Sequence, residues 1–424
     1  MSTTRLLTLG MVLLVAGTEA LAQEAIYDES KLPEFTLPDP LTTVSGKSIK
    51  TAEEWTDIRR PEVLRLFQEH VFGYPPQIDI DSPIRVTVVS QNKSAIGGAA
   101  VRREIRVQFG DSADAPAMMM LVYTPAHAAG PVPAFLGLNF NGNHTIEDDP
   151  SIAITDSWVR NNSKIGVKDH QASAAARGSS ASRWPVKMIV DRGYALATIY
   201  YGDIDPDFDD GFENGIHRLE DTSQRTKNSG GSIAAWAWGL SRALDVLQGD
   251  SSIDGSRVAV IGHSRLGKTS LWAGASDPRF ALVISNNSGC GGAALSRRRF
   301  GESVRRINTS FPHWFNLQHR EYNENEDACP VDHHLLIALM APRPVYVASA
   351  VEDRWADPHG EFLSVYHAGP VYELFDRRSI PTDEMPELNQ PIQLDVGYHI
   401  RTGKHDVTSF DWQQYLDFAD AHLK

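Results

Sequence analysis

The sequence predicts a three-layer α/β sandwich, in which a mainly parallel central sheet is covered by helices on both faces. Strand-like segments alternate with amphipathic helical segments along most of the chain. Several strand-like segments, such as Val258–Ile261, are apolar at every position, which is typical of strands that are buried on both faces. No repeat or low-complexity linker divides the 424 residues. We therefore expect one domain over residues 23–424, with a helical N-terminal extension.

The first 22 residues have the features of a secretory signal peptide. Arg5 supplies a positive charge, and the apolar run Leu6–Ala16 is too short to span a bilayer. Ala20-Leu21-Ala22 fits the small-residue cleavage rule, so the mature chain is expected to start at Gln23. We expect a secreted or periplasmic protein without a membrane partner.

The composition restricts the classes of partner. The chain has 40 basic and 54 acidic residues, a net charge of −14, which argues against general affinity for nucleic acid or anionic membranes. We expect a monomer that needs no cofactor. The two cysteines, Cys290 and Cys329, are compatible with one disulfide or with two separate thiols, because sequence does not report their distance.

The elements follow from hydrophobic periodicity. Helices are predicted over Thr51–Tyr74 (divided at Pro61), Ile233–Leu247, Leu266–Ala275 and Trp412–His422. Strands are predicted over Ile84–Ser90, Val101–Phe109, Met118–Thr124, Ala134–Leu138, Tyr194–Tyr200, Val258–Ile261, Phe280–Ser285, Val345–Ser349 and Ile392–Val396.

Three polar segments interrupt this pattern. Residues 161–183 are expected to be an excursion over the surface. The acidic segment Gly202–Asp210 lacks the spacing of an EF-hand, so we expect a solvated loop and no metal. The run Arg297–Arg299 is expected to be mostly solvated charge, although one of its members can meet an acidic glycan.

One stretch concentrates the chemistry. The strand Val258–Ile261 runs into Gly262-His263-Ser264, and the next helix follows at once. A serine between a strand and a helix, with a glycine close before it, indicates a nucleophile elbow. The stretch from Gly262 to Thr269, with Gly267 and Lys268, also matches the phosphate-binding P-loop pattern. A strand-turn-helix without any chemistry is the third interpretation.

The rest of the chain favours the nucleophile. An elbow serine needs an acid and then a histidine, in that order along the chain. Asp353, Glu352 and Asp357 follow the predicted strand Val345–Ser349, and Asp353 is preferred because its short side chain lies a few residues past the strand. His405 lies in a loop before the last helix. This order predicts an α/β-hydrolase fold with Ser264, His405 and Asp353 as its catalytic residues.

Two residues beside the serine suit the same chemistry. Arg265 follows the nucleophile and can offer its backbone N–H and its guanidinium to a developing oxyanion. Lys268 lies one helical turn beyond Ser264, so it can face the mouth of the site and donate to sugar hydroxyls. An ordinary surface lysine is the alternative for Lys268.

These motifs resemble the glucuronoyl esterases, carbohydrate esterase family 15, of the bacterial type. The elbow Gly262-x-Ser264-Arg265-x-Gly267-Lys268 matches the family's form, in which arginine follows the serine and the second glycine comes one position late. Other matching pieces are Ser288-Gly-x-Gly-Gly292, Trp355-Ala-Asp-Pro358, Gly403-Lys-His405 and the stretch from Trp55 to Pro75. The resemblance spans about residues 50 to 420.

The resemblance implies a specific reaction. Such enzymes cleave the ester between a glucuronic acid of xylan, usually 4-O-methylated, and an alcohol of lignin. It also implies that Glu302 and Trp355 bind the uronate, by hydrogen bonds and by ring contact respectively. The expected substrate is therefore glucuronoxylan or a lignin–carbohydrate complex. An acetyl or feruloyl xylan esterase is an alternative.

The sequence departs from the fungal members at two places. The fungal catalytic glutamate precedes the Ser-Gly-x-Gly-Gly segment, where this chain has Asn287. Bacterial relatives often carry the acid where Asp353 stands, whereas loss of the acid would leave a glycan-binding protein with a decayed site. The fungal disulfide beside the nucleophile is absent, because His263 and Asp406 occupy its positions.

Overall fold

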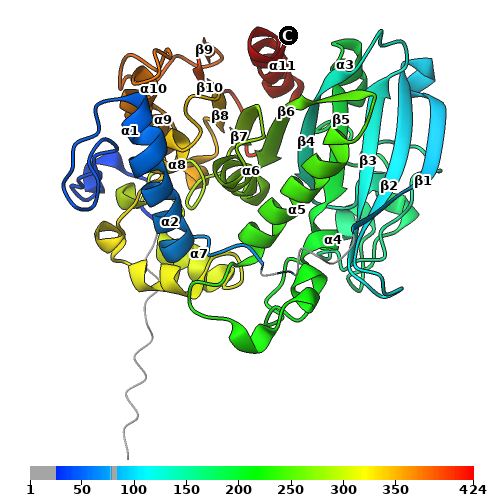
Figure 1. The fold of residues 1–424 in the computed structure, drawn as a ribbon, viewed down its shortest axis with the longest axis horizontal. Coiled ribbons are helices and arrows are strands. Elements are labelled where there is room, and N and C mark those ends of the chain that lie inside the picture. The colour runs from blue at the N-terminus through cyan, green and yellow to red at the C-terminus, as the bar shows by residue number, and fades with distance from the viewer. Residues whose placement is uncertain (1–24, 77, 79–83) are drawn as a thin grey trace, which may run out of the picture.

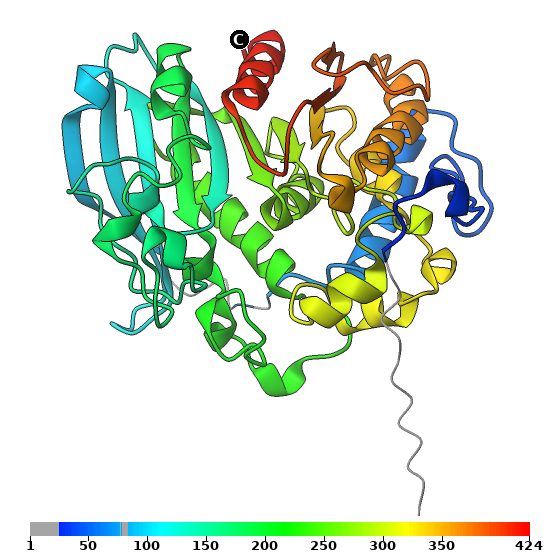
Figure 2. The ribbon, with the colours of Figure 1, turned by 180° about the vertical axis from the view of Figure 1, so that it is seen from behind.

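The computed structural model describes residues 25–76, 78 and 84–424, so the predicted signal peptide lies outside the described residues. Within them, one 10-stranded sheet runs in the order β1-β2-β3-β5-β4-β6-β7-β8-β10-β9. Figures 1 and 2 show β1 at one end of this sheet and β9 and β10 toward the other. The strands are β1 (Ile84–Ala95), β2 (Ala100–Phe109), β3 (Ala117–Pro125), β4 (Val132–Asn139), β5 (Ala195–Tyr200), β6 (Ile253–His263), β7 (Leu282–Asn286), β8 (Val345–Ala350), β9 (Ile392–Gln393) and β10 (Val396–Arg401).

The middle of the sheet is parallel, from β5 through β4, β6, β7 and β8 to β10. The strands at the two ends pair antiparallel with their neighbours. Because the parallel strands all point the same way, the turns after β6, β8 and β10 meet at one edge of the sheet. These three turns carry Ser264, Asp353 and His405.

Helices cover the two faces of the sheet, as the three-layer prediction requires. Successive residues of β6 serve different cores: Val258 and Val260 belong to one buried cluster, and Ala259 and Ile261 belong to the other. The helices are α1 (Ala52–Glu54), α2 (Arg60–His70), α3 (Val186–Asp191), α4 (Tyr201–Ile204), α5 (Ser232–Gln248), α6 (Arg265–Ser276), α7 (Val304–Ser310), α8 (His333–Ala338), α9 (Pro358–His367), α10 (Gly369–Glu373) and α11 (Ser409–Leu423).

Pro61 does not divide the first helical region into two separate helices. A π-helical segment, Trp55–Arg59, joins α1 to α2, and Pro61 lies in the first turn of α2. Proline lacks an N–H and crowds the carbonyl of the preceding turn, and the wider π turn accommodates both defects.

The strand predicted over Ile392–Val396 is placed wrongly. The short β9 ends at Gln393, and the strand that joins the parallel sheet is β10, whose six residues are all buried. Its polar members His399 and Arg401 hide the strand in the sequence, because their buried partner, Asp411, belongs to a different element.

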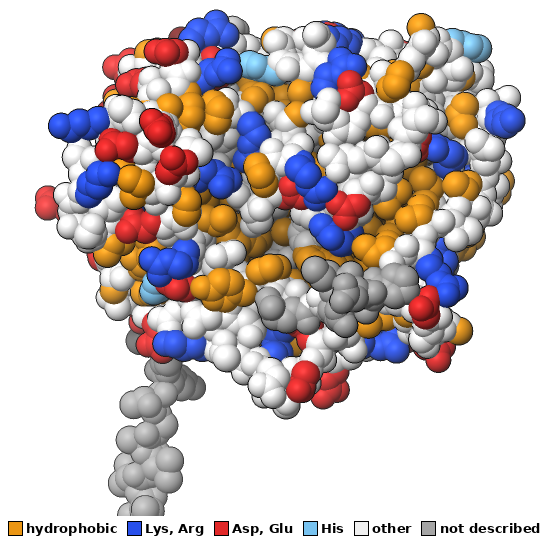
Figure 3. All heavy atoms as spheres, in the orientation of Figure 1, with side chains coloured by type: hydrophobic (Ala, Val, Ile, Leu, Met, Phe, Trp, Pro, Cys, Tyr) orange, Lys and Arg blue, Asp and Glu red, His pale blue; other side chains and the backbone are white. Residues whose placement is uncertain are grey.

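The two cysteine thiols are free and buried. Burial raises the pKa of Cys329 to about 12 and raises that of Cys290 further, so both remain protonated thiols. Acidic and basic side chains are interspersed on the face drawn in Figure 3. No helix in the described part of the chain combines the length and the hydropathy of a membrane span.

Candidate active site

Ser264 occupies a strained backbone position between β6 and α6. Its φ of 58° and ψ of −129° lie in a region that residues with a side chain rarely adopt. The turn is tight, since a Cβ on Gly262 would lie 1.8 Å from the carbonyl oxygen of Leu266. Only glycine therefore fits at position 262. The geometry is that of a nucleophile elbow, in which the serine hydroxyl stands clear of the helix.

The structure places His405 against Asp353. The Nδ1 atom of His405 donates to Oδ2 of Asp353 at 2.5 Å, and the carboxylate is 6% exposed. The two other candidate acids lie differently: Asp357 caps α9 and pairs with Arg298, and neither Asp357 nor Glu352 lines the cavity that Ser264, Asp353 and His405 line. Asp353 is thus the carboxylate that can fix the tautomer of His405 and stabilise its charged form.

Asn287 supports this carboxylate rather than replacing it. The buried Asn287 side chain donates from Nδ2 to Oδ2 of Asp353 at 2.9 Å, the same oxygen that accepts from His405. Two donors therefore hold the carboxylate in place. The amide at position 287 is accordingly no sign of a decayed site.

Arg265 is anchored by Asp207, a residue that was wrongly predicted to be solvated. Asp207, which was expected in a solvated loop, is 1% exposed and accepts from the Arg265 guanidinium. It also accepts from Tyr201 Oη at 2.9 Å, His313 Nε2 at 2.9 Å and Trp314 Nε1 at 2.7 Å. The prediction of solvation was wrong because most of these donors, those of Arg265, His313 and Trp314, come from distant parts of the chain and replace water around the carboxylate.

This anchor is charged. Burial alone would raise the pKa of Asp207, but the hydrogen bond from His313 and the charge of Arg265 outweigh it and hold that pKa well below its ordinary range. The Arg265 guanidinium also lies 4.9 Å from the centre of the Trp314 ring. Arg265 is therefore fixed beside Ser264, with its backbone N–H at the start of α6, where helical N–H groups lack partners inside the helix.

Lys268 is buried and not a surface lysine. Its Nζ donates to the carbonyls of Ser288 at 2.5 Å and Cys290 at 2.6 Å, and lies 3.6 Å from Oε2 of Glu302. Burial raises the pKa of Glu302, although the neighbouring Lys268 acts against that rise. Trp355 is 38% exposed, and the Arg306 guanidinium lies 5.5 Å from its ring centre.

All seven predicted site residues line one cavity of about 340 Å³. They are Ser264, Arg265, Lys268, Glu302, Asp353, Trp355 and His405. Phe311 and Trp314 also line it and were missed, although the aromatic run Phe311-Pro-His-Trp314 in a polar region was a usable signal. No local sequence pattern indicated that Asp207 belongs to the site. Among the described residues, no group of three or more His, Cys, Asp or Glu side chains is arranged to hold a metal ion.

The expectation of mostly solvated charge at Arg297–Arg299 was wrong. Arg297 and Arg298 are 7% and 4% exposed. Arg297 donates to the carbonyls of Thr36 and Cys329, and Arg298 pairs with Glu29 and Asp357. These arginines bind the N-terminal segment to the body of the protein, and that pairing of distant segments leaves no local sequence pattern.

Comparison with known proteins points to one family. The family described as glucuronyl esterase of fungi matches residues 224–376. A curated relative, carbohydrate esterase MZ0003 from an unknown prokaryotic organism, is 52% identical over 400 residues, covering 94% of this chain and 92% of that protein. A 4-O-methyl-glucuronoyl methylesterase from Schizophyllum commune is 28% identical, covering 80% of this chain and 73% of that protein.

Solved structures agree with the sequence relatives. A promiscuous CE15 esterase from a marine bacterial metagenome superposes with a TM-score of 0.88 at 52% identity, covering 94% of this chain and 100% of that one. A glucuronoyl esterase from Solibacter usitatus gives a TM-score of 0.88 at 46% identity, covering 93% and 100%. The fold described above is thus shared with solved esterases.

Proposed function

The chain belongs to carbohydrate esterase family 15, the glucuronoyl esterases, and on that premise we propose that it hydrolyses esters of glucuronic acid. The expected bond joins a (4-O-methyl-)glucuronic acid of glucuronoxylan to an alcohol of lignin. One observation carries the proposal: the elbow serine, the His405–Asp353 pair and the buried Lys268–Glu302 pair line the same 340 Å³ cavity.

The acid and base steps follow from the contacts of His405. Its Nδ1–H is held by Asp353, so Nε2 is free to accept a proton from the Ser264 hydroxyl. The Ser264 oxygen attacks the ester carbonyl carbon, and the protonated His405 then gives its proton to the departing alcohol. Water, deprotonated by His405, attacks the resulting glucuronoyl-serine ester. The bond to Ser264 breaks, His405 returns the proton to the serine oxygen, and the uronate is released.

Arg265 stabilises the negative oxygen that forms in both steps. The Asp207 carboxylate and the Trp314 ring hold the guanidinium in place before substrate binds, so little rearrangement is needed during the reaction. Removing one such donor from an oxyanion site typically lowers kcat by about 10²–10³-fold.

Lys268 and Glu302 suit the hydroxyl-bearing face of a sugar ring. The ammonium is a donor and the carboxylate an acceptor, and both are buried at the cavity wall, 3.6 Å apart. Trp355 offers a partly exposed ring beside them. A sugar hydroxyl placed here replaces water with a charge-assisted hydrogen bond.

The reaction is tested with benzyl glucuronate and a benzyl ester of matched size whose acyl part lacks hydroxyl groups. We expect hydrolysis of the glucuronate, a much lower kcat/KM for the other ester, and loss of activity in Ser264→Ala. Equal rates on both esters would contradict the proposed acyl specificity. Retained activity in Ser264→Ala would contradict the nucleophile.

We also propose export as a monomer, on the basis of the N-terminal sequence and the acidic composition. N-terminal sequencing of protein recovered outside the cytoplasm should begin at Gln23, and light scattering should give the mass of one chain. An uncleaved N-terminus or a dimer mass would refute the corresponding part.

A further inference from the structure

The loop that carries His405 is tied at both ends to one buried carboxylate. Residues 402–408 join β10 to α11, and Asp411, in the first turn of α11, is fully buried. Arg401, at the start of the loop, donates from Nε to both Asp411 oxygens, at 2.7 and 3.0 Å. Thr408, at the end of the loop, donates from its backbone N–H and its hydroxyl to Asp411 Oδ2, each at 2.7 Å.

Arg401 also donates to three backbone carbonyls of the loop. Its Nη1 donates to the carbonyl of Thr402 at 3.1 Å. Its Nη2 donates to the carbonyls of Lys404 at 3.1 Å and Asp406 at 2.6 Å. Lys404 and Asp406 are the residues on either side of His405. The guanidinium therefore fixes the backbone before and after the histidine.

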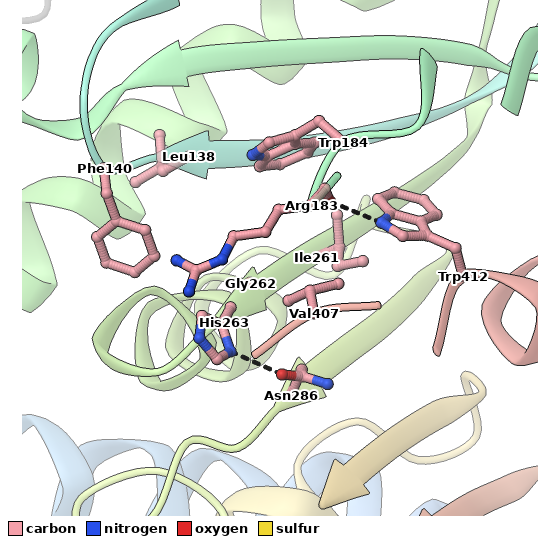
Figure 4. Close-up of a pocket in the computed structure, with 10 residues that line it drawn as sticks. All are labelled: Leu138, Phe140, Arg183, Trp184, Ile261, Gly262, His263, Asn286, Val407 and Trp412. Carbon is pink, nitrogen blue, oxygen red and sulfur yellow. Dashed lines mark hydrogen bonds between the residues drawn. The ribbon is translucent and has the colours of Figure 1, made fainter. Parts of the chain in front are cut away.

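A second branch of contacts reaches the nucleophile. Asn286 donates from Nδ2 to Tyr415 Oη at 2.7 Å and to Asp411 Oδ1 at 3.4 Å, and its carbonyl accepts from the backbone N–H of Ser264 at 2.9 Å. Figure 4 shows its side chain bonded to His263, whose Nδ1 donates to Asn286 Oδ1 at 2.6 Å beside a small cavity of about 30 Å³.

The ring of His405 packs against the ring of His263. The centres of the two imidazole rings are 4.4 Å apart, and the His263 residue is 7% exposed. Burial, together with the nearby His405, holds the pKa of His263 well below its ordinary range, so this ring is neutral. A neutral ring can pack against His405 without repelling the charge that His405 gains during the reaction.

We propose that Arg401 and Asp411 are positioning residues, which set the place of His405 relative to Ser264 through the loop 402–408 and Asn286. The inference rests on the proposed esterase reaction. Proton transfer needs the imidazole and the serine hydroxyl within hydrogen-bond reach, and a loop exposed on one side loses that geometry readily. A buried charge pair that bonds the loop at several points restricts it before the substrate arrives.

The test compares Arg401→Gln with Arg343→Gln. Arg343 is a matched control, because it also donates to three backbone carbonyls, those of Gly274, Asp277 and Phe280, but it precedes β8 at the opposite edge of the sheet. We expect Arg401→Gln to lower kcat by roughly 10- to 100-fold with KM within about twofold of wild type. Arg343→Gln should keep kcat within about twofold, although both variants unfold at lower temperature.

Labelling of Ser264 by an aryl phosphonate supplies a readout that needs no uronate recognition. We expect Arg401→Gln to be labelled at least tenfold more slowly than Arg343→Gln. Equal labelling rates, or a fall in kcat shared by both variants, would overturn the positioning role. If wild type is labelled but does not hydrolyse glucuronate esters, the proposed function fails while the labelling ratio still decides the inference.

If Arg401→Gln does not fold, Arg401→Lys replaces it. Lysine keeps the charge opposite Asp411 but cannot bond Asp411 and three carbonyls together. We expect an unfolding temperature below that of wild type, with a labelling rate and a kcat lowered about three- to tenfold. Wild-type values for both would overturn the proposal.

Discussion

Replacing Asp353 tests whether it is the carboxylate that supports His405 during the reaction. Asp353→Ala removes the partner of His405 Nδ1 and leaves the Nδ2 group of Asn287 without its acceptor. The imidazole then loses both the tautomer needed by Ser264 and the charge that stabilises its protonated form. We expect kcat to fall by about 10⁴-fold, the size seen when the acid of such a triad is replaced.

The contacts also predict a partial rescue. Asn287 Nδ2 and His405 Nδ1 both donate to the same oxygen of Asp353, at 2.9 Å and 2.5 Å. The side chain at position 287 therefore points toward the histidine. A glutamate there is one methylene longer and can bring a carboxylate to Nδ1. We expect Asp353→Ala with Asn287→Glu to recover about 10- to 100-fold of the lost kcat, roughly 1.4 to 2.7 kcal/mol of barrier.

The assay is the steady-state hydrolysis of benzyl glucuronate by the two variants and by wild type, with circular dichroism to confirm that each is folded. Asn287→Ala serves as the control, because it removes a support of Asp353 without adding a carboxylate, and it should lower kcat less than Asp353→Ala does. If Asp353→Ala retained more than a tenth of the wild-type kcat, the assignment of Asp353 would be refuted.

Three further outcomes are expected. Asp207→Asn should lower kcat about tenfold or more, because Arg265 loses its anchoring charge, and should destabilise the protein at pH 7 by about 3 kcal/mol in urea unfolding. The pKa of Asp207 in the folded protein lies below the unfolded value of 3.8, so the stabilisation that its charge provides is complete above about pH 5 and is lost as the pH falls. The difference in unfolding free energy between variant and wild type should therefore shrink toward pH 3. A constant difference would contradict the charged anchor. Lys268→Met should raise KM for glucuronate esters about tenfold yet leave phosphonate labelling of Ser264 nearly unchanged, and unaltered KM would exclude Lys268 from substrate binding.

The sequence predicted the elements whose evidence is local. The elbow around Ser264 is a contiguous strand, turn and helix, and its glycine requirement is visible in Gly262. The order of serine, acid and histidine follows from where parallel strands end, so Asp353 and His405 could also be placed from sequence.

Buried charges could not be placed in the same way. Asp207, Arg298 and Arg401 look like solvated residues in the sequence. Asp207 and Arg298 are buried against charges far along the chain, Arg265 and Asp357, and Arg401 is buried against Asp411 of the next helix. Sequence pattern records hydrophobic periodicity and turn chemistry, but it does not record which distant charges meet. The residues that hold the site in place were therefore hidden from the sequence, while the residues proposed to carry its chemistry could be named from it and line one cavity.

The most direct test of the account is the identity of the covalent intermediate. Wild type is mixed with benzyl glucuronate, quenched in acid within the first turnover and digested, and the peptides are analysed by mass spectrometry. The account predicts a glucuronoyl ester on the peptide containing Ser264, formed at the rate at which benzyl alcohol is released and absent in Ser264→Ala. Release of benzyl alcohol with no adduct, together with continued turnover by Ser264→Ala, would contradict it.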